Sequence, residues 1–130
     1  DLNTFSSKTL KQDEVLGEFD SNWYQSERVF VTARDGKKVP VSIVYRKDKF
    51  NKDGTNPVYQ YAYGSYGATI EPYFSASRLS LLDRGFVFAL AHIRGGQMLG
   101  RSWYEDGKMF NKINTYIEHC KPILVAVLCK

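Results

Sequence analysis

Apolar and polar residues alternate in the first third of the chain in a pattern typical of paired β-strands. Residues 28–33 form one such segment, and residues 39–45 form another in which every second residue from Val39 to Tyr45 is apolar. The dipeptide Asp35-Gly36 lies between the two segments and is a strong turn signal. The pattern therefore predicts an antiparallel hairpin.

The middle of the chain predicts a strand, a helix and a second strand. Residues 58–63 form the first strand, and the glycine-rich segment 64–67 ends it. A helix is expected around residues 75–84, with Gly85 in the position of a C-terminal cap. Residues 86–93 are nearly all apolar, which indicates a strand buried on both faces.

A strand–helix–strand step requires parallel pairing of its two strands. Short helical turns are expected at residues 102–108, and a further helix is expected to begin near Asn114. The fold class is therefore α/β, a partial sheet with an antiparallel leading hairpin. We also expect the strand at 86–93 to lack neighbours within this chain, and so to expose an apolar edge that favours aggregation.

Charge and composition exclude several functions. The chain has 130 residues, and its 18 Lys and Arg against 14 Asp and Glu give a net charge of +4. The densest basic cluster, residues 46–49, is interrupted by Asp48, so a nucleic-acid-binding patch is not expected. The longest apolar run, residues 123–129, is too short to span a bilayer, so no membrane association is expected.

The cysteines and histidines do not predict a disulfide framework or a metal site. Cys120 and Cys129 are the only cysteines, which makes a reducing compartment, the cytoplasm, the expected location. No Cys/His spacing matches a zinc site, and we expect no metal or organic cofactor.

The two ends of the sequence resemble cuts within a longer protein. The chain begins at Asp1 without an initiator methionine, and its last residues, 125–130, stop inside an apolar run. We therefore expect the sequence to be a segment of a larger protein.

The segment from Tyr59 to Gly67 is a candidate for chemistry. It is a strand that runs into a glycine-broken turn, and ligands of open α/β sheets bind at the carboxyl ends of strands. A tyrosine hydroxyl that points into such a crevice can donate to a developing oxyanion. The alternative is that Tyr61, Tyr63 and Tyr66 are ordinary aromatic residues of the sheet.

The remaining motifs do not form a catalytic centre. Residues 94–100 match neither the dinucleotide-binding nor the phosphate-loop pattern and are expected to form a tight turn. Ser65 lies in Gly-Ser-Tyr-Gly, one residue too short for the Gly-x-Ser-x-Gly nucleophile motif. His92 is expected to be a strand-end residue, and His119 lies in the terminal helix. The sequence thus predicts no nucleophile–base pair.

Several blocks in order and spacing resemble the oligopeptidase B branch of the prolyl oligopeptidase (S9) family of serine peptidases. The resemblance runs from Glu27 to about Tyr116, and its blocks are Val31-Thr32-Ala33-Arg34-Asp35-Gly36, Val39-Pro40-Val41-Ser42, Tyr63-Gly64-Ser65-Tyr66-Gly67, Ser77-Arg78-Leu79, Leu82-Asp83-Arg84-Gly85, His92-Ile93-Arg94-Gly95-Gly96, Trp103-Tyr104-Glu105-Asp106-Gly107-Lys108 and Asn114-Thr115.

The resemblance implies a β-propeller followed by an α/β-hydrolase domain. Residues 1–20 would then be the end of the propeller or the connection from it, and residues 21–130 would be the N-terminal part of the hydrolase domain, truncated before the catalytic serine. The resemblance also implies that Tyr63 is an oxyanion donor and that Tyr66 lies near the substrate pocket. The family's serine, aspartate and histidine all come later than this chain.

The implied function is hydrolysis of short peptides after Arg or Lys, by acyl transfer to serine, with the chain itself inactive alone. The segment after Tyr116, beginning Ile117-Glu118-His119, departs from the family pattern and suggests a frameshift, a chimeric junction or a damaged gene. Two alternatives stay open: a catalytically dead fragment that acts as an interaction module, and an α/β-hydrolase esterase. The oligomeric state is not predicted.

Overall fold

The computed structural model describes residues 1–120 and forms one open sheet with short helices at its ends. The strands are β1 (Tyr24–Thr32), β2 (Lys38–Arg46), β3 (Val58–Ala62) and β4 (Val87–Ala91). The α-helices are α1 (Ala76–Leu82), α2 (Arg101–Glu105) and α3 (Lys112–Cys120), and short 3-10 turns span Ser21–Trp23, Lys47–Lys49 and Met109–Asn111.

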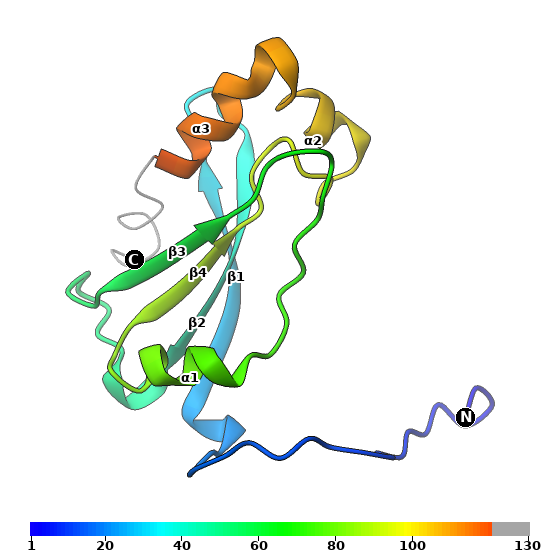
Figure 1. Cartoon of the computed structure of the whole chain (residues 1–130), viewed down its shortest axis with the longest axis vertical. Helices are drawn as coiled ribbons and strands as arrows, with labels where there is room; N and C mark the ends of the chain where they lie inside the picture. The colour runs from blue at the N-terminus through cyan, green and yellow to red at the C-terminus, as the bar shows by residue number, and fades with distance from the viewer. Residues whose placement is uncertain (121–130) are drawn as a thin grey trace.

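The sheet has the order β1-β2-β4-β3; β2 is antiparallel to both β1 and β4, and β3 is parallel to β4. Figure 1 shows α2 and α3 near the carboxyl ends of β3 and β4, with α1 at the opposite end of these strands. The predicted α/β class, the leading hairpin and the parallel strand–helix–strand step are confirmed. Residues 1–20 contain no helix or strand, and their assignment to a propeller stays a prediction.

The alternation in the second strand of the hairpin places its apolar residues in the core. Val39, Val41, Ile43 and Tyr45 are all buried, and Val41 is fully inaccessible. Val41 pairs with Ala91 across the β2–β4 ladder, so both strands contribute to one apolar layer. Period-two alternation produces this layer because successive side chains of a strand point to opposite faces.

The expectation that the buried strand lacks neighbours is wrong. Every residue of β4 is buried, and β4 is paired on one side with β2 and on the other with β3. The hairpin folds back so that β2 occupies the edge that was expected to be open. Within the described residues, the strands with one partner only are β1 and β3.

The helices have the predicted order but shorter extents. Helix α1 ends at Leu82, and Gly85 adopts the left-handed φ of 87° that lets the chain turn into β4. Helix α3 begins at Lys112, two residues before the predicted Asn114. Among residues 1–120, no helix has the length and apolar character that crossing a membrane requires. The apolar run at 123–129 lies outside the described residues.

A tyrosine on the first strand links the hairpin to the end of α1. The hydroxyl of Tyr24 donates to Oδ1 of Asp83 at 2.6 Å, and Nη1 of Arg46 donates to the same oxygen at 2.8 Å. Burial, together with the bond to the Asp83 carboxylate, raises the pKa of Tyr24 to about 12.

We predict that this link makes the fold sensitive to alkali. The folded state favours the neutral phenol, so the stabilising contribution is complete below pH 10.0 and is lost as the pH rises towards about 12. In Tyr24→Phe, the free energy of unfolding, measured by urea denaturation, should fall less steeply over this interval than in the parent chain. An unchanged slope would show that Tyr24 does not contribute to the pH dependence.

Candidate functional site

Two turns meet at the carboxyl ends of the parallel strands. The first turn, residues 64–67, follows β3, and the second turn, residues 94–96, follows β4. The backbone N–H of Gly67 donates to the carbonyl oxygen of Gly95 at 2.9 Å, so the turns are directly bonded. Ligands of open α/β sheets bind in this region of the fold.

Glycine is required where these turns approach each other. A Cβ atom added to Gly95 would lie 2.1 Å from the carbonyl oxygen of Gly64, and the φ of Gly95 is +94°. A Cβ atom on Gly107 would lie 2.2 Å from the amide nitrogen of Gly95. Backbone contacts this close exclude any side chain, which explains Gly95 in the segment 94–100 that was predicted to form a tight turn.

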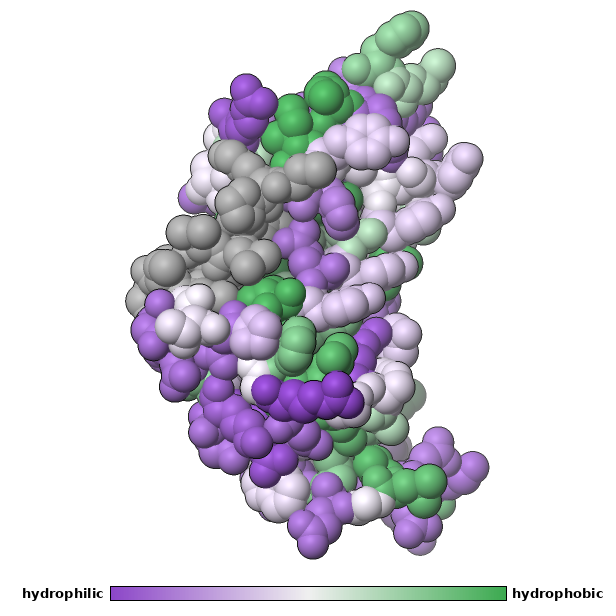
Figure 2. Space-filling view, turned by 60° about the vertical axis from the view of Figure 1, so that its left-hand side comes forward, coloured by the Kyte–Doolittle hydropathy of each residue, from purple (hydrophilic) through white to green (hydrophobic). Residues whose placement is uncertain are grey.

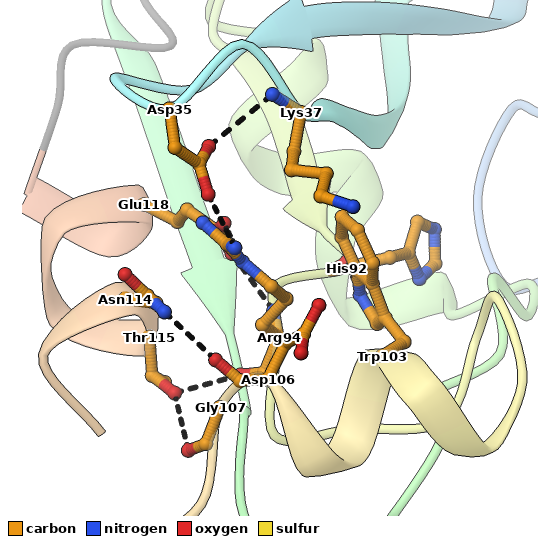
Figure 3. Close-up of polar contacts among 10 residues, drawn as sticks. All are labelled: Asp35, Lys37, His92, Arg94, Trp103, Asp106, Gly107, Asn114, Thr115 and Glu118. Atoms are coloured by element: carbon orange, nitrogen blue, oxygen red, sulfur yellow. Dashed lines mark hydrogen bonds and ion pairs between the residues drawn. The ribbon is translucent and has the colours of Figure 1, made fainter. Parts of the chain in front are cut away.

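The second turn starts at a buried arginine that is held by two carboxylates (Figure 3). The side chain of Arg94 is 4% exposed, and its Nη1 lies 2.6 Å from Oδ2 of Asp35 in the hairpin turn. Its Nε donates to Oε1 of Glu118 on α3, and its backbone N–H donates to Oε2 of Glu118 at 2.8 Å. Three segments that are far apart in the sequence therefore meet at one guanidinium.

The electrostatics of this cluster follow from burial and charge. Burial lowers the pKa of Arg94, but the bonds to Asp35 and Glu118 outweigh it and hold the pKa above its ordinary value. The hydrogen bond from Arg94 lowers the pKa of Asp35. Burial raises the pKa of Glu118, and Arg94 opposes the rise. Both oxygens of Glu118 accept N–H bonds, the arrangement expected of an ionised carboxylate.

Further bonds attach the second turn to its surroundings. The hydroxyl of Thr115 donates to the carbonyl oxygens of Arg94, at 2.8 Å, and of Gly107, at 3.0 Å. The indole N–H of Trp103 donates to the carbonyl oxygen of His92 at 2.9 Å. The backbone N–H of Gly95 donates to the carbonyl oxygen of Trp103 at 3.0 Å, so the backbone of this turn is bonded to both helices, α2 and α3.

The first turn is held by Lys112, the first residue of α3. Its ammonium group donates to the carbonyl oxygen of Gly64 and to Oγ of Ser65, the latter at 2.7 Å. Burial lowers the pKa of Lys112. Sequence reasoning gave no site role to Lys112, Thr115 or Glu118, because their partners lie between 8 and 48 residues away and leave no local signal.

The structure places the predicted tyrosines at the first turn. Tyr63 directly follows β3, and its side chain is 39% exposed. It borders a cavity of about 10 Å³, large enough for about one water molecule, beside His92 and Met98. Tyr61 is 41% exposed and alternates with the half-buried Gln60 and Ala62 within β3.

Tyr66 lies at the outer end of the same turn. It is 89% exposed and has a left-handed φ of 55°, which is unusual for a residue with a side chain. Tyr66 thus lies within the first turn and Tyr63 immediately before it, while their roles stay predictions. Figure 2 shows weakly polar, ring-bearing side chains that project along one side of the molecule.

One serine–histidine contact was not predicted. Oγ of Ser42 lies 2.9 Å from Nε2 of His92, and burial lowers the pKa of His92, which favours its neutral form. However, Arg28 also donates to Oγ of Ser42, at 3.2 Å, and no hydrogen bond to Nδ1 of His92 is formed by residues 1–120. A serine in mid-strand with no group orienting its histidine lacks what a nucleophile–base pair needs. We interpret this contact as structural.

Metal-ligating side chains do not gather at this site. In the described part of the chain, no three His, Cys, Asp or Glu residues are grouped so as to hold a metal ion.

The chemistry that the arrangement supports is hydrogen-bond donation and backbone positioning at the end of a parallel strand pair. The fold is therefore an α/β sheet whose candidate site lies where open α/β sheets bind their ligands.

Comparison with known proteins places this arrangement in a family. The model of the prolyl oligopeptidase family matches residues 72–121. Dipeptidyl aminopeptidase BI from Pseudoxanthomonas mexicana is 58% identical over 116 residues, which are 88% of this chain and 16% of that protein. Protease 2 from Moraxella lacunata is 43% identical over 117 residues, 90% of this chain and 17% of that protein.

Solved structures agree with the sequence comparison. The structure of oligopeptidase B from Leishmania major matches with a TM-score of 0.87 and 43% identity, over 98% of this chain and 18% of that one. The chain belongs to the prolyl oligopeptidase family of serine peptidases. It spans about a sixth of the length of the relatives that it matches.

The expected departure from the family at Ile117 is wrong for residues 117–121. The family match continues to residue 121, and α3 continues to Cys120. Glu118, which was assigned to the departing segment, supplies the buried carboxylate for Arg94. The expected departure at Pro122 lies beyond the family match, and Pro122, Cys129 and Lys130 lie outside the described residues.

We predict that Glu118→Gln destabilises the fold by about 3 kcal/mol, because it leaves the buried Arg94 with one carboxylate only. The free energy of unfolding from chemical denaturation measures the effect. Glu105→Gln is the matched control. Glu105 pairs with Arg101 and Lys108 at the surface, so its replacement should leave the stability almost unchanged. Equal effects of the two substitutions would contradict a central role for the Arg94 cluster.

Proposed function

We propose that this chain is the leading part of the α/β-hydrolase domain of a serine-type oligopeptidase that hydrolyses short peptides after basic residues. The support is the similarity to oligopeptidase B from Leishmania major, at 43% identity over 98% of the chain. In this proposal residues 1–130 are inactive alone, because the sequence contains no Gly-x-Ser-x-Gly motif.

The observation that carries the proposal is the position of Tyr63. It lies at the carboxyl end of a parallel strand, half exposed, immediately before a turn that is bonded to the neighbouring turn. A phenol held in this way can donate to the oxyanion of the tetrahedral intermediate, while the serine nucleophile comes from a later part of the protein. Donors that are already in place cost no reorganisation when the charge develops.

Tyr66 is proposed to contact the substrate. Its side chain is 89% exposed and lies three residues beyond Tyr63, so it can reach a peptide bound over the turn. This contact would affect substrate binding rather than the chemical step, because it does not involve the reacting atoms.

A second candidate activity is supported by the higher identity to another relative. The chain is 58% identical to a dipeptidyl aminopeptidase, which suggests release of dipeptides from a free amino terminus. The two activities share the same acyl-transfer chemistry and differ in which end of the substrate is recognised.

We predict that the full-length protein cleaves an Arg-containing fluorogenic peptide, whereas purified residues 1–130 do not. An acetyl-blocked and a free-amino version of the peptide separate the two candidates. Cleavage of the blocked peptide after Arg supports oligopeptidase activity, and cleavage of the free-amino peptide alone supports the aminopeptidase. Hydrolysis of acyl esters but of neither peptide would overturn both in favour of an esterase.

We predict that Tyr63→Phe in the full-length peptidase lowers kcat about a hundredfold and leaves KM nearly unchanged. The hydroxyl matters little to the neutral carbonyl of the bound substrate and much to the charged intermediate, and the remaining ring preserves packing. Tyr61→Phe is the control, since it removes the same atom from the same face two residues further from the turn. Near-parent kcat for Tyr63→Phe, or an equal loss for Tyr61→Phe, would show that Tyr63 is an ordinary aromatic residue of the sheet.

A further inference from the structure

The ammonium group of Lys112 is placed where it can control the geometry of the first turn. It donates to the carbonyl oxygen of Gly64, the residue immediately after Tyr63, and to Oγ of Ser65 at 2.7 Å. Both acceptors belong to the segment that sets the direction of the Tyr63 side chain. The bonds join α3 to this segment across 47 and 48 residues of sequence.

The other side of the same segment is closed by backbone packing. A Cβ atom on Gly64 would lie 2.5 Å from the carbonyl oxygen of Arg94 and 2.5 Å from Cγ2 of Thr115. Gly64 is therefore held between the second turn and α3, with Lys112 bonded to its carbonyl group. A peptide unit fixed on both sides has little freedom to rotate.

The backbone of Lys112 belongs to a helix, α3, that is bonded to the second turn. Lys112 begins α3, and three residues later Thr115 bonds to the carbonyl oxygen of Arg94. Glu118, on the same helix, pairs with the side chain of Arg94. The ammonium group is thus carried by a helix that is itself fixed to the second turn.

We propose that Lys112 is a positioning residue for the oxyanion donor: by bonding the Gly64 carbonyl and the Ser65 hydroxyl, it holds the turn that orients the Tyr63 hydroxyl. This role rests on the proposed function of Tyr63. Lys112 acts through Tyr63 and does not touch the reacting atoms. Misplacement of a catalytic group by about 1 Å can lower a rate about a hundredfold, so a modest rotation of this turn has a measurable effect.

The test uses the full-length peptidase and its best Arg-containing peptide. Lys112→Met removes the ammonium group and keeps a side chain of similar length; Lys112→Arg keeps a cationic donor. We expect Lys112→Met to lower kcat about tenfold with KM changed less than about twofold, and Lys112→Arg to recover most of the loss. Lys108→Met is the control, because Lys108 pairs with Glu105 at the surface, away from the turn.

A double-mutant cycle with Tyr63→Phe separates the positioning role from a general structural one. If Lys112 acts through the Tyr63 hydroxyl, Lys112→Met should cost less than about twofold in kcat when that hydroxyl is already absent. An equal loss in both backgrounds would overturn the positioning role and leave the role of Tyr63 standing. If Tyr63→Phe alone keeps parent kcat, the proposed function of Tyr63 fails first.

Ser65→Ala covers the case in which Lys112→Met does not fold. It removes one acceptor of the ammonium group and leaves the backbone intact, so we expect a smaller loss of kcat that again disappears in the Tyr63→Phe background. A loss that persists in that background, or no loss at all, would overturn the proposal.

Discussion

The buried charge of Arg94 is the constraint on which this end of the molecule depends. A guanidinium that is 4% exposed would be very costly without partners, and two carboxylates supply them. These carboxylates come from the hairpin turn, at Asp35, and from α3, at Glu118. The need to pair one charge therefore fixes the hairpin turn and α3 around the carboxyl end of β4.

The glycines make this arrangement possible at close range. Gly64, Gly95 and Gly107 allow three backbone segments to approach each other to distances at which a side chain could not fit. Such contacts resist small shifts because close-packed backbone has no flexible side chain that can give way. A hydrogen-bond donor carried by this region, as Tyr63 is proposed to be, would be held in place before the reaction begins.

The site has hydrogen-bond donors but no serine nucleophile motif, which agrees with the small part of its relatives' length that the chain covers. The chain corresponds to about a sixth of its relatives, and no nucleophile motif occurs in it. Its proposed contribution to catalysis is an oxyanion donor and the scaffold that orients it. The Ser42–His92 contact shows that proximity of a serine and a histidine is not enough, since Arg28 shares the same oxygen.

Local pattern determined the class of the elements and the faces of the strands. The alternation from Val39 to Tyr45 predicted the buried face of β2, and Gly85 predicted the end of α1. The resemblance to the prolyl oligopeptidase family also came from the sequence, because the order and spacing of short blocks can be read without knowing which residues are in contact. The choice of Tyr63 among the tyrosines of residues 59–67 came from the same resemblance, since the strand and the glycines alone left the alternative of an ordinary aromatic residue open.

Tertiary structure decided which elements meet. The sequence did not show that β2 would pair with β4, because strand pairing depends on packing between segments rather than on local periodicity. Nor did it show that Glu118 pairs with Arg94 or that Lys112 bonds Gly64, since these partners lie 24 and 48 residues apart. A charged residue on a short helix is typical of a solvated surface, and only the folded chain shows that Glu118 is buried against Arg94 and that Lys112 bonds to the first turn.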